Sequence, residues 1–133
     1  MKQVRILFAF TLLTVLISGQ QVHAQDFFKT NAGMCKMLAD TTFGTAALVT
    51  FNPGQKTTLH THAAEFLYAL TDGTLTVHYA DGRTVEFALK EGDSMMAPSD
   101  SPHWTENLGK KPVKFILVEF DEHPYMPAKK MSN

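Results

Sequence analysis

The chain has 133 residues, of which 44% are hydrophobic and 19% charged, so it holds enough apolar material for one compact core and is too short for two domains. Its 12 Lys and Arg against 13 Asp and Glu leave a formal charge of −1, which argues against nucleic acid or an anionic membrane surface as a partner. The single cysteine excludes an intramolecular disulfide and a zinc–thiolate cluster.

Residues 1–24 have the order of a secretory signal peptide. Lys2 and Arg5 precede an apolar run over 6–17, and Val22 and Ala24 stand where small residues precede a cleavage site. The run is shorter than the roughly 20 residues that a membrane-spanning helix needs. We therefore expect cleavage after Ala24 and export of a domain over 25–133, periplasmic or secreted in a bacterial context, with no membrane attachment afterwards.

Residues 25–44 contain apolar side chains without a clean period. We interpret this segment as a strand or loop that packs on the rest of the domain. Its lone cysteine, Cys35, stands among apolar neighbours, which is typical of a buried and inert thiol.

Short β-branched or aromatic runs then alternate with Gly, Pro, Asp and Asn clusters as far as residue 120. This spacing is typical of an all-β sandwich or barrel. Asp81-Gly82 between two such runs indicates a hairpin turn. The expected strands are 45–51, 57–62, 65–70, 74–79, 83–89, 94–97, 104–107 and 113–120.

The domain contains five histidines that are to be considered as ligands. His60 and His62 stand two residues apart at the end of an expected strand, so both side chains project to one face and can reach the same ion. Alone, such a pair is more often surface decoration. His78 is out of phase with its apolar neighbours, which favours a structural or surface role, and His123 lies in a loose tail.

Two motifs in this region resemble those of the cupin family. The first family motif is a Gly, five residues, His-x-His, three or four residues, Glu, six residues and Gly. Gly54, His60, His62, Glu65 and Gly73 occupy these places. The glutamate spacing departs from the family, because only two residues separate His62 from Glu65 and seven separate Glu65 from Gly73.

The second family motif is Gly, five residues, Pro-x-Gly, two residues, His, three residues and Asn. Gly92, Pro98, His103 and Asn107 match it, while Asp100 replaces the middle glycine. The resemblance covers about 44–121 and implies a single-domain cupin, a jelly-roll-like double-stranded β-barrel.

In cupins the histidines and glutamate of these motifs bind one divalent metal inside the barrel. The resemblance thus implies a site of His60, His62, Glu65 and His103 for Fe, Mn, Ni, Zn or Cu. The altered spacing leaves two alternatives: Glu65 still reaches the metal, or three histidines are the only ligands. Imidazole nitrogen suits several of these ions, so a three-histidine site is chemically sound.

The resemblance leaves the activity open. A metal with open coordination positions favours an enzyme of oxygenase, isomerase or lyase type that acts on a small molecule, with Glu65 as fourth ligand or general base. The alternatives are a small-ligand binding module without turnover and a structural homodimer with a vestigial site. Tyr68, Met96 and Trp104 stand near the ligands in the sequence and are candidate substrate-binding residues. A homodimer is expected, because a single barrel has edge strands to cover.

Overall fold

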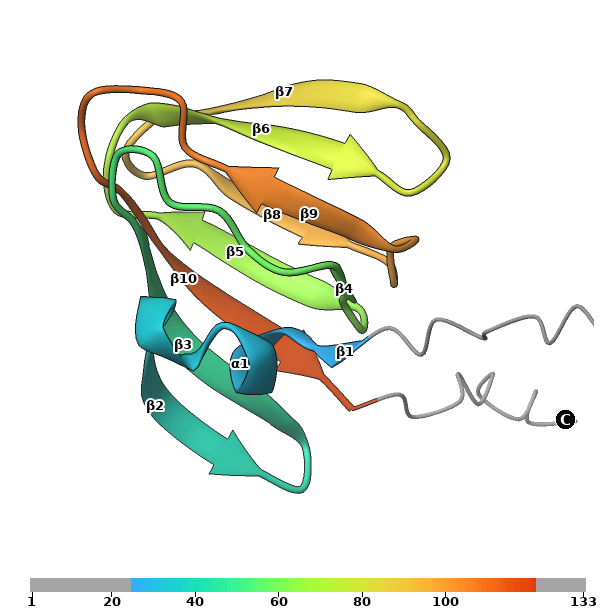
Figure 1. Cartoon of the computed structure of the whole chain (residues 1–133). Helices are drawn as coiled ribbons and strands as arrows, with labels where there is room; N and C mark the ends of the chain where they lie inside the picture. The colour runs from blue at the N-terminus through green and yellow to red at the C-terminus, as the bar shows by residue number, and fades with distance from the viewer. Residues whose placement is uncertain (1–24, 122–133) are drawn as a thin grey trace, which may run out of the picture.

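The computed structural model describes residues 25–121, which form two β-sheets packed face to face (Figure 1). The predicted signal peptide and His123 lie outside the described residues. Within 25–121, no helix is both long and apolar enough to cross a membrane. The all-β, jelly-roll-like fold expected from the sequence is confirmed.

The first sheet has the strand order β1-β4-β9-β6-β7. Strands β1 and β4 pair in parallel, and the other pairs are antiparallel. The bounds are β1 (Gln25–Asp26), β4 (His60–Thr61), β9 (His103–Glu106), β6 (Gly73–Tyr79) and β7 (Thr84–Leu89).

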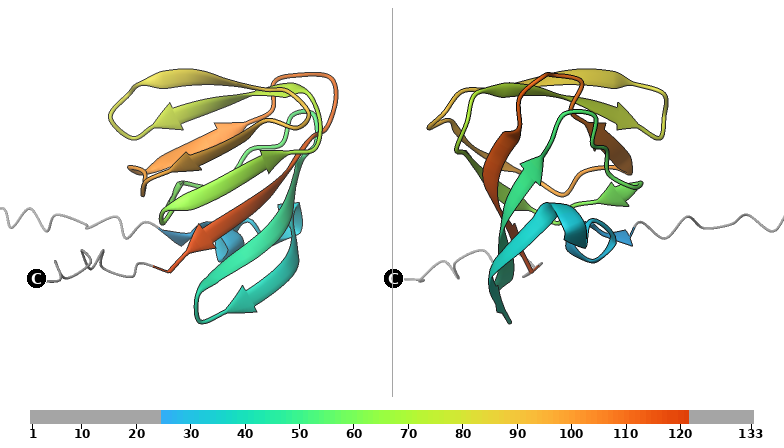
Figure 2. Two further views of the ribbon diagram at one scale, coloured as in Figure 1. Left: turned by 180° about the vertical axis from the view of Figure 1, so that it is seen from behind. Right: turned by 60° about the vertical axis from the view of Figure 1, so that its left-hand side comes forward.

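The second sheet has the order β2-β3-β10-β5-β8, and all its pairs are antiparallel. Strands β6 and β7 lie at one end of the molecule and β2 and β3 at the other, as both figures show (Figures 1 and 2). The bounds are β2 (Cys35–Thr41), β3 (Gly44–Phe51), β10 (Val113–Phe120), β5 (Glu65–Ala69) and β8 (Ser94–Ala97).

All eight expected strands from 45 to 120 are present, although β4 is shorter than expected. Its predicted first half, 57–59, leaves the regular ladder. Thr57 instead donates its backbone N–H to the Thr105 carbonyl at 2.9 Å, and its hydroxyl accepts the Thr105 N–H at 2.8 Å. These bonds satisfy the buried backbone without a continuous strand.

The segment 25–44 contains more structure than the strand-or-loop interpretation allows. Helix α1 (Phe27–Thr30) and the 3-10 turn η1 (Ala32–Met34) lie between β1 and β2. Asp26 caps α1, because its carboxylate accepts the backbone N–H groups of Phe28 and Lys29 at 3.0 and 3.4 Å. The interpretation therefore holds for β1 and β2 and is corrected for the helical turn.

The core lies between the sheets and consists of the side chains that alternate inward along the strands. Gly73 opens β6 where β10 passes closely: a Cβ at this position would lie 2.3 Å from Val113 Cγ2. Gly92 adopts φ +89°, a turn conformation that favours glycine. The largest contributors to the core include Phe27, Phe51, Leu67, Leu75, Phe115 and Leu117, all at most 5% exposed.

Candidate metal centre

The first sheet brings His60 and His103 together. The two residues are direct partners in the β4–β9 ladder, and their ring centroids are 4.5 Å apart. His103 is the first residue of β9 and follows Pro102, whose missing N–H suits a strand entry.

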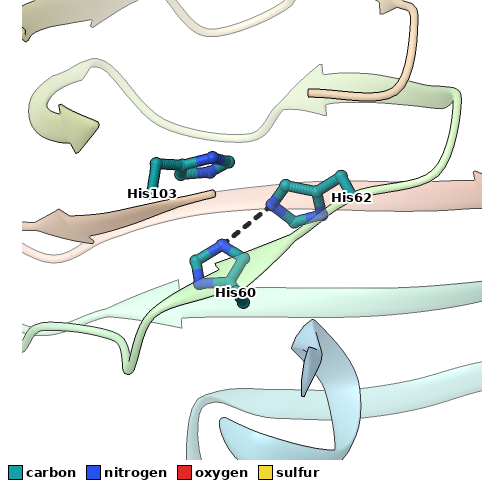
Figure 3. A group of neighbouring side chains, drawn as sticks. All are labelled: His60, His62 and His103. Carbon is teal, nitrogen blue, oxygen red and sulfur yellow. Dashed lines mark hydrogen bonds between the residues drawn. The ribbon is translucent and has the colours of Figure 1, made fainter. Parts of the chain in front are cut away.

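His62 completes a group of three. One ring nitrogen from each of His60, His62 and His103 lies within 4.8 Å of the other two, so the three together could hold a metal ion. Figure 3 shows the three rings gathered at one point of the barrel, with His60 and His62 linked by a dashed line. The expected convergence of the three histidines is therefore present.

The partners of the Nδ1 atoms fix the tautomers of all three rings. His60 Nδ1 lies 2.7 Å from the Thr58 carbonyl, and His103 Nδ1 lies 2.8 Å from the Ser101 carbonyl. A carbonyl oxygen only accepts, so both Nδ1 atoms carry the proton. His62 Nδ1 faces the Glu119 carboxylate at 2.5 Å and donates to it in the same way.

The three Nε2 atoms are consequently bare lone pairs when the rings are neutral. His60 Nε2 and His62 Nε2 face each other at 3.1 Å, where neither has a proton to donate. Two facing lone pairs repel unless a cation lies between them. Two nitrogens that each bind one ion at about 2.1 Å stand about 3 Å apart when the angle at the ion is near 90–100°. The donor set therefore fits a divalent metal.

Burial keeps the Nε2 atoms of His60 and His103 free of protons. His60 is 1% exposed, and burial lowers its pKa from 6.5 to about 3. Burial also lowers the pKa of His103, against the opposing effect of its bond to the Ser101 carbonyl. Neutral imidazoles are the form that binds metal.

Glu65 does not join the three-histidine group. Its Oε2 lies 3.2 Å from His62 Nδ1, on the side of the ring away from Nε2, and it forms a separate cluster with His62 and Glu119. The one proton of His62 Nδ1 serves Glu119, so Glu65 Oε2 is buried with no hydrogen-bond partner among the described residues. Burial raises the pKa of Glu65.

A cavity of about 170 Å³ opens onto the histidines, and both sheets contribute to its wall. The predicted substrate-binding residues Tyr68, Met96 and Trp104 are not among the residues that line this cavity, and their role in binding stays a prediction. Successive strand residues point to opposite faces, so each of the three is one position out of phase. Their neighbours Leu67, Met95, Ala97, His103 and Thr105 line the cavity instead.

Two other residues considered in the sequence, His78 and Cys35, do not line the cavity. His78 stacks on Trp104 with ring centroids 3.8 Å apart, and its Nε2 lies 2.9 Å from a Glu106 oxygen. The structural role expected for His78 fits this position. Cys35 is half-buried and packs against the core, and burial, with a smaller effect of Glu119, raises its pKa to about 11.

Four residues of the site were not singled out as functional from the sequence. Glu119 is in phase with Val113, Phe115 and Leu117 on β10, so a carboxylate on an inward face was the available signal. Tyr79 is in phase with the apolar side chains of β6. Asp100 stands where the motif has glycine. Phe27, whose ring centroid lies 4.8 Å from that of His60 and 4.9 Å from that of His62, had no local signal.

Comparison with known families agrees with this geometry. The Cupin domain family matches residues 47–119, more than half of the chain. The chain belongs to the cupin family. Cupins commonly bind divalent metals, and the three histidines of this chain are a group that could hold one.

Two relatives show how the domain is used elsewhere. The chain is 32% identical over 108 residues to oxalate decarboxylase OxdC of Bacillus subtilis, covering 79% of this chain and 26% of that protein. It is 25% identical over 77 residues to auxin-binding protein 1 of Arabidopsis thaliana, covering 53% of this chain and 39% of that protein. The chain thus spans well under half the length of either relative.

Solved structures share the fold. A cupin domain from Bordetella pertussis superposes with a TM-score of 0.60 at 22% identity, covering 66% of this chain and 92% of that one. An RmlC-like cupin with a double-stranded β-helix fold from Methanocaldococcus jannaschii superposes with a TM-score of 0.54 at 17% identity, covering 65% of this chain and 77% of that one. At these identities the likeness concerns the architecture alone.

Proposed function

We propose that this cupin holds one divalent metal ion on the Nε2 atoms of His60, His62 and His103. The observation that carries the proposal is the shared tautomer: each Nδ1 proton is donated to an oxygen, and the Nε2 lone pairs of His60 and His62 face each other at 3.1 Å. Glu65 lies behind His62, which favours three histidine ligands over the four-ligand alternative.

The proposed activity is metal-dependent turnover of a small molecule. A metal with three protein ligands keeps open positions and supplies Lewis-acid or redox chemistry there. Glu65 lines the cavity and offers a carboxyl oxygen without a partner, so we assign it the role of general base toward a molecule bound there. Reaction types that fit are oxygenase, isomerase and lyase chemistry.

The alternative function is a binding module with the same metal and no turnover. The two are separated by oxygen uptake and product formation with the Fe(II), Mn(II) and Ni(II) forms on a panel of small metabolites. Because one relative is an oxalate decarboxylase by name, the panel includes oxalate. The binding module would be favoured if a compound binds but no compound yields product, and if the Glu65→Gln variant binds that compound as tightly as the parent protein.

Metal content tests the site itself. Each of His60→Ala, His62→Ala and His103→Ala removes a ligand, and we expect each to lose stoichiometric metal by elemental analysis of untagged protein. Glu65→Gln is the matched contrast, because a three-histidine site keeps its metal in this variant. His78→Ala, outside the site, is the control. One metal per chain in His103→Ala with unchanged affinity would refute the site.

Export is proposed on the sequence pattern of residues 1–24 alone. The exported protein should begin at Gln25 or at its cyclised form, because cleavage is expected after Ala24. Mass spectrometry of the extracellular or periplasmic fraction measures this directly. An intact Met1 on exported protein would contradict it.

A further inference from the structure

The cavity beside the histidines has an apolar body and one polar end. Its apolar wall comes from the inward faces of the two sheets, including Phe51, Leu67, Leu75 and Leu117, which are at most 5% exposed. Beyond the histidines, the polar side chains of the wall are those of Glu65, Tyr79, Asp100 and Thr105. A ligand therefore meets hydrocarbon over most of its surface and oxygen atoms near the histidines.

The charged side chains of this wall are all acidic. Glu65 and Asp100 line the cavity, whereas no lysine or arginine among residues 25–121 does so. Arg83 places its guanidinium 4.3 Å from the centre of the Tyr79 ring, and its Nε donates to Asp81 at 2.8 Å. The Arg83 side chain is 60% exposed and does not line the cavity.

Asp100 is held in place by its own contacts. The Tyr79 hydroxyl donates to Asp100 Oδ2 at 2.9 Å, and the backbone N–H of Ser101 donates to Oδ1 at 2.7 Å. Asp100 Oδ2 also lies 3.8 Å from His103 Nδ1. The carboxylate is thus a fixed charge at the metal end, at the position where the second cupin motif has a glycine.

The charge of a metal ion here would already be opposed by protein carboxylates. Three neutral imidazoles leave a divalent ion its two positive charges, and both Asp100 and Glu119 lie within 4 Å of a ring nitrogen of a ligand histidine. An anionic ligand is therefore not required for charge balance. A ligand carboxylate would instead face the carboxylates of Glu65 and Asp100, whose side chains are 16% and 39% exposed, and like charges repel.

We propose that this cavity selects a neutral or cationic small molecule, with an apolar body and a hydroxyl, thiol or amine group directed at the histidines, and excludes small carboxylates. The inference rests on the proposed function and names its substrate class. Hydrogen-bond donors on such a ligand match the acceptor oxygens of Glu65 and Asp100, which a carboxylate cannot do.

Three probes of similar size and different charge test the proposal: benzylamine, benzyl alcohol and benzoate. Each is titrated into the Co(II)-loaded full chain, and binding is read from the visible absorption of Co(II) and from calorimetry. We expect the amine and the alcohol to bind at least about tenfold more tightly than benzoate, because like-charge contacts penalise the anion.

Two variants locate the source of this selectivity. Asp100→Asn keeps the shape of the side chain and an acceptor for the Ser101 N–H but removes the charge. The ratio of the benzoate and benzylamine dissociation constants, which we call the selectivity gap, should therefore fall by about threefold or more. Asp40→Asn removes an exposed carboxylate that does not line the cavity and should leave the gap unchanged.

The outcomes separate this inference from the proposed function. Benzoate binding as tightly as the other two, or no probe perturbing Co(II) at millimolar concentration, overturns the inference while the metal site stands. An unchanged gap in Asp100→Asn overturns the role of Asp100. Failure of the chain to take up Co(II) overturns the proposed function itself.

Discussion

Glu119 connects a ligand histidine to the opposite sheet. It lies on β10, directly across the ladder from Glu65, and accepts the Nδ1 proton of His62. A carboxylate in this position orients the ring, fixes its tautomer and raises the basicity of Nε2. We therefore expect Glu119 to be a positioning residue for the proposed metal, although it belongs to neither cupin motif.

We expect Glu119→Ala to weaken metal binding by about 10- to 100-fold, the usual effect of losing such a partner. Glu119→Gln retains an acceptor oxygen without the charge. Its metal affinity should lie between that of Glu119→Ala and that of the parent protein. The dissociation constant for Zn(II) or Co(II), measured by competition with a chelator, gives the result. Glu86→Ala, an exposed carboxylate on β7, serves as control. Equal affinity in Glu119→Ala would remove Glu119 from the site.

The buried His60 ring makes the stability of the metal-free protein depend on pH. Its pKa is about 3 in the folded chain against 6.5 for an ordinary histidine, so between these values the unfolded chain binds a proton that the folded one refuses. The contribution of neutral His60 to the free energy of unfolding is therefore fully present above pH 6.5 and is lost as the pH falls below that value. For His60 alone the loss reaches about 2 kcal/mol at pH 5.

Urea unfolding of chelator-treated protein at pH 7.5 and pH 5, compared with His60→Gln, measures this contribution. The comparison is needed because Glu65, with a raised pKa, acts in the opposite direction as the pH falls. The lowered pKa of His103 adds to the effect of His60. Were His60→Gln to lose as much stability between the two pH values as the parent, the burial of His60 would not be the cause.

Among the secondary-structure elements, the short helix α1 contacts the site through its first residue, Phe27. Its four residues place the Phe27 ring, 2% exposed, against the rings of His60 and His62. Strand β1 precedes it and pairs in parallel with β4, which carries His60. The start of the described chain therefore packs against the metal end of the barrel.

Phe27→Ala should destabilise the domain by about 3–5 kcal/mol, because it leaves a cavity beside the ligands that the surroundings cannot fill. Metal affinity should fall in the same variant, since two ligand rings lose their support. Denaturant unfolding and chelator competition measure the two effects. Phe43→Ala removes the same side chain where it is 73% exposed, and its stability should stay within about 0.5 kcal/mol of the parent. Similar losses in both variants would contradict the packing role of α1.

At the scale of the whole molecule, β2 is an edge strand of the second sheet. Within residues 25–121 it pairs only with β3, and its ladder shifts register between Met37 and Ala39. Met37 and Leu38 are 47% and 51% exposed. Exposed apolar residues on an unpaired edge are a template for association with another chain.

We expect the protein to form a homodimer through this edge. Light scattering at micromolar concentration should give about twice the 14.8 kDa of the full chain, or twice the mass of the processed form. Leu38→Lys places a charge on the edge and should yield a monomer. Lys36→Gln, on the same strand, is the control. A parent protein that is monomeric under these conditions would contradict the expectation.

Local patterns in the sequence determined the strands and the three histidines of the proposed metal site. Alternating side chains placed β6 and β7, because a two-residue period is a property of the strand itself. The motif spacings identified His60, His62 and His103 as the residues that would meet. Alternation also indicates which side chains of a strand point inward. Closeness to a histidine in the sequence does not indicate this. Tyr68, Met96 and Trp104 were chosen by proximity, and they lie one position out of phase with the cavity.

Only the tertiary structure decided what surrounds the ligands. Glu119 follows His62 by 57 positions and Phe27 precedes His60 by 33, so their contacts depend on sheet order and packing, which no local pattern encodes. The role of Glu65 was likewise open in the sequence. The shortened spacing after His62 was compatible with Glu65 as a fourth metal ligand and with a site of three histidines alone. The fold resolved it because β5 pairs with β10, and this ladder holds Glu65 beside Glu119 and behind the His62 ring, away from Nε2.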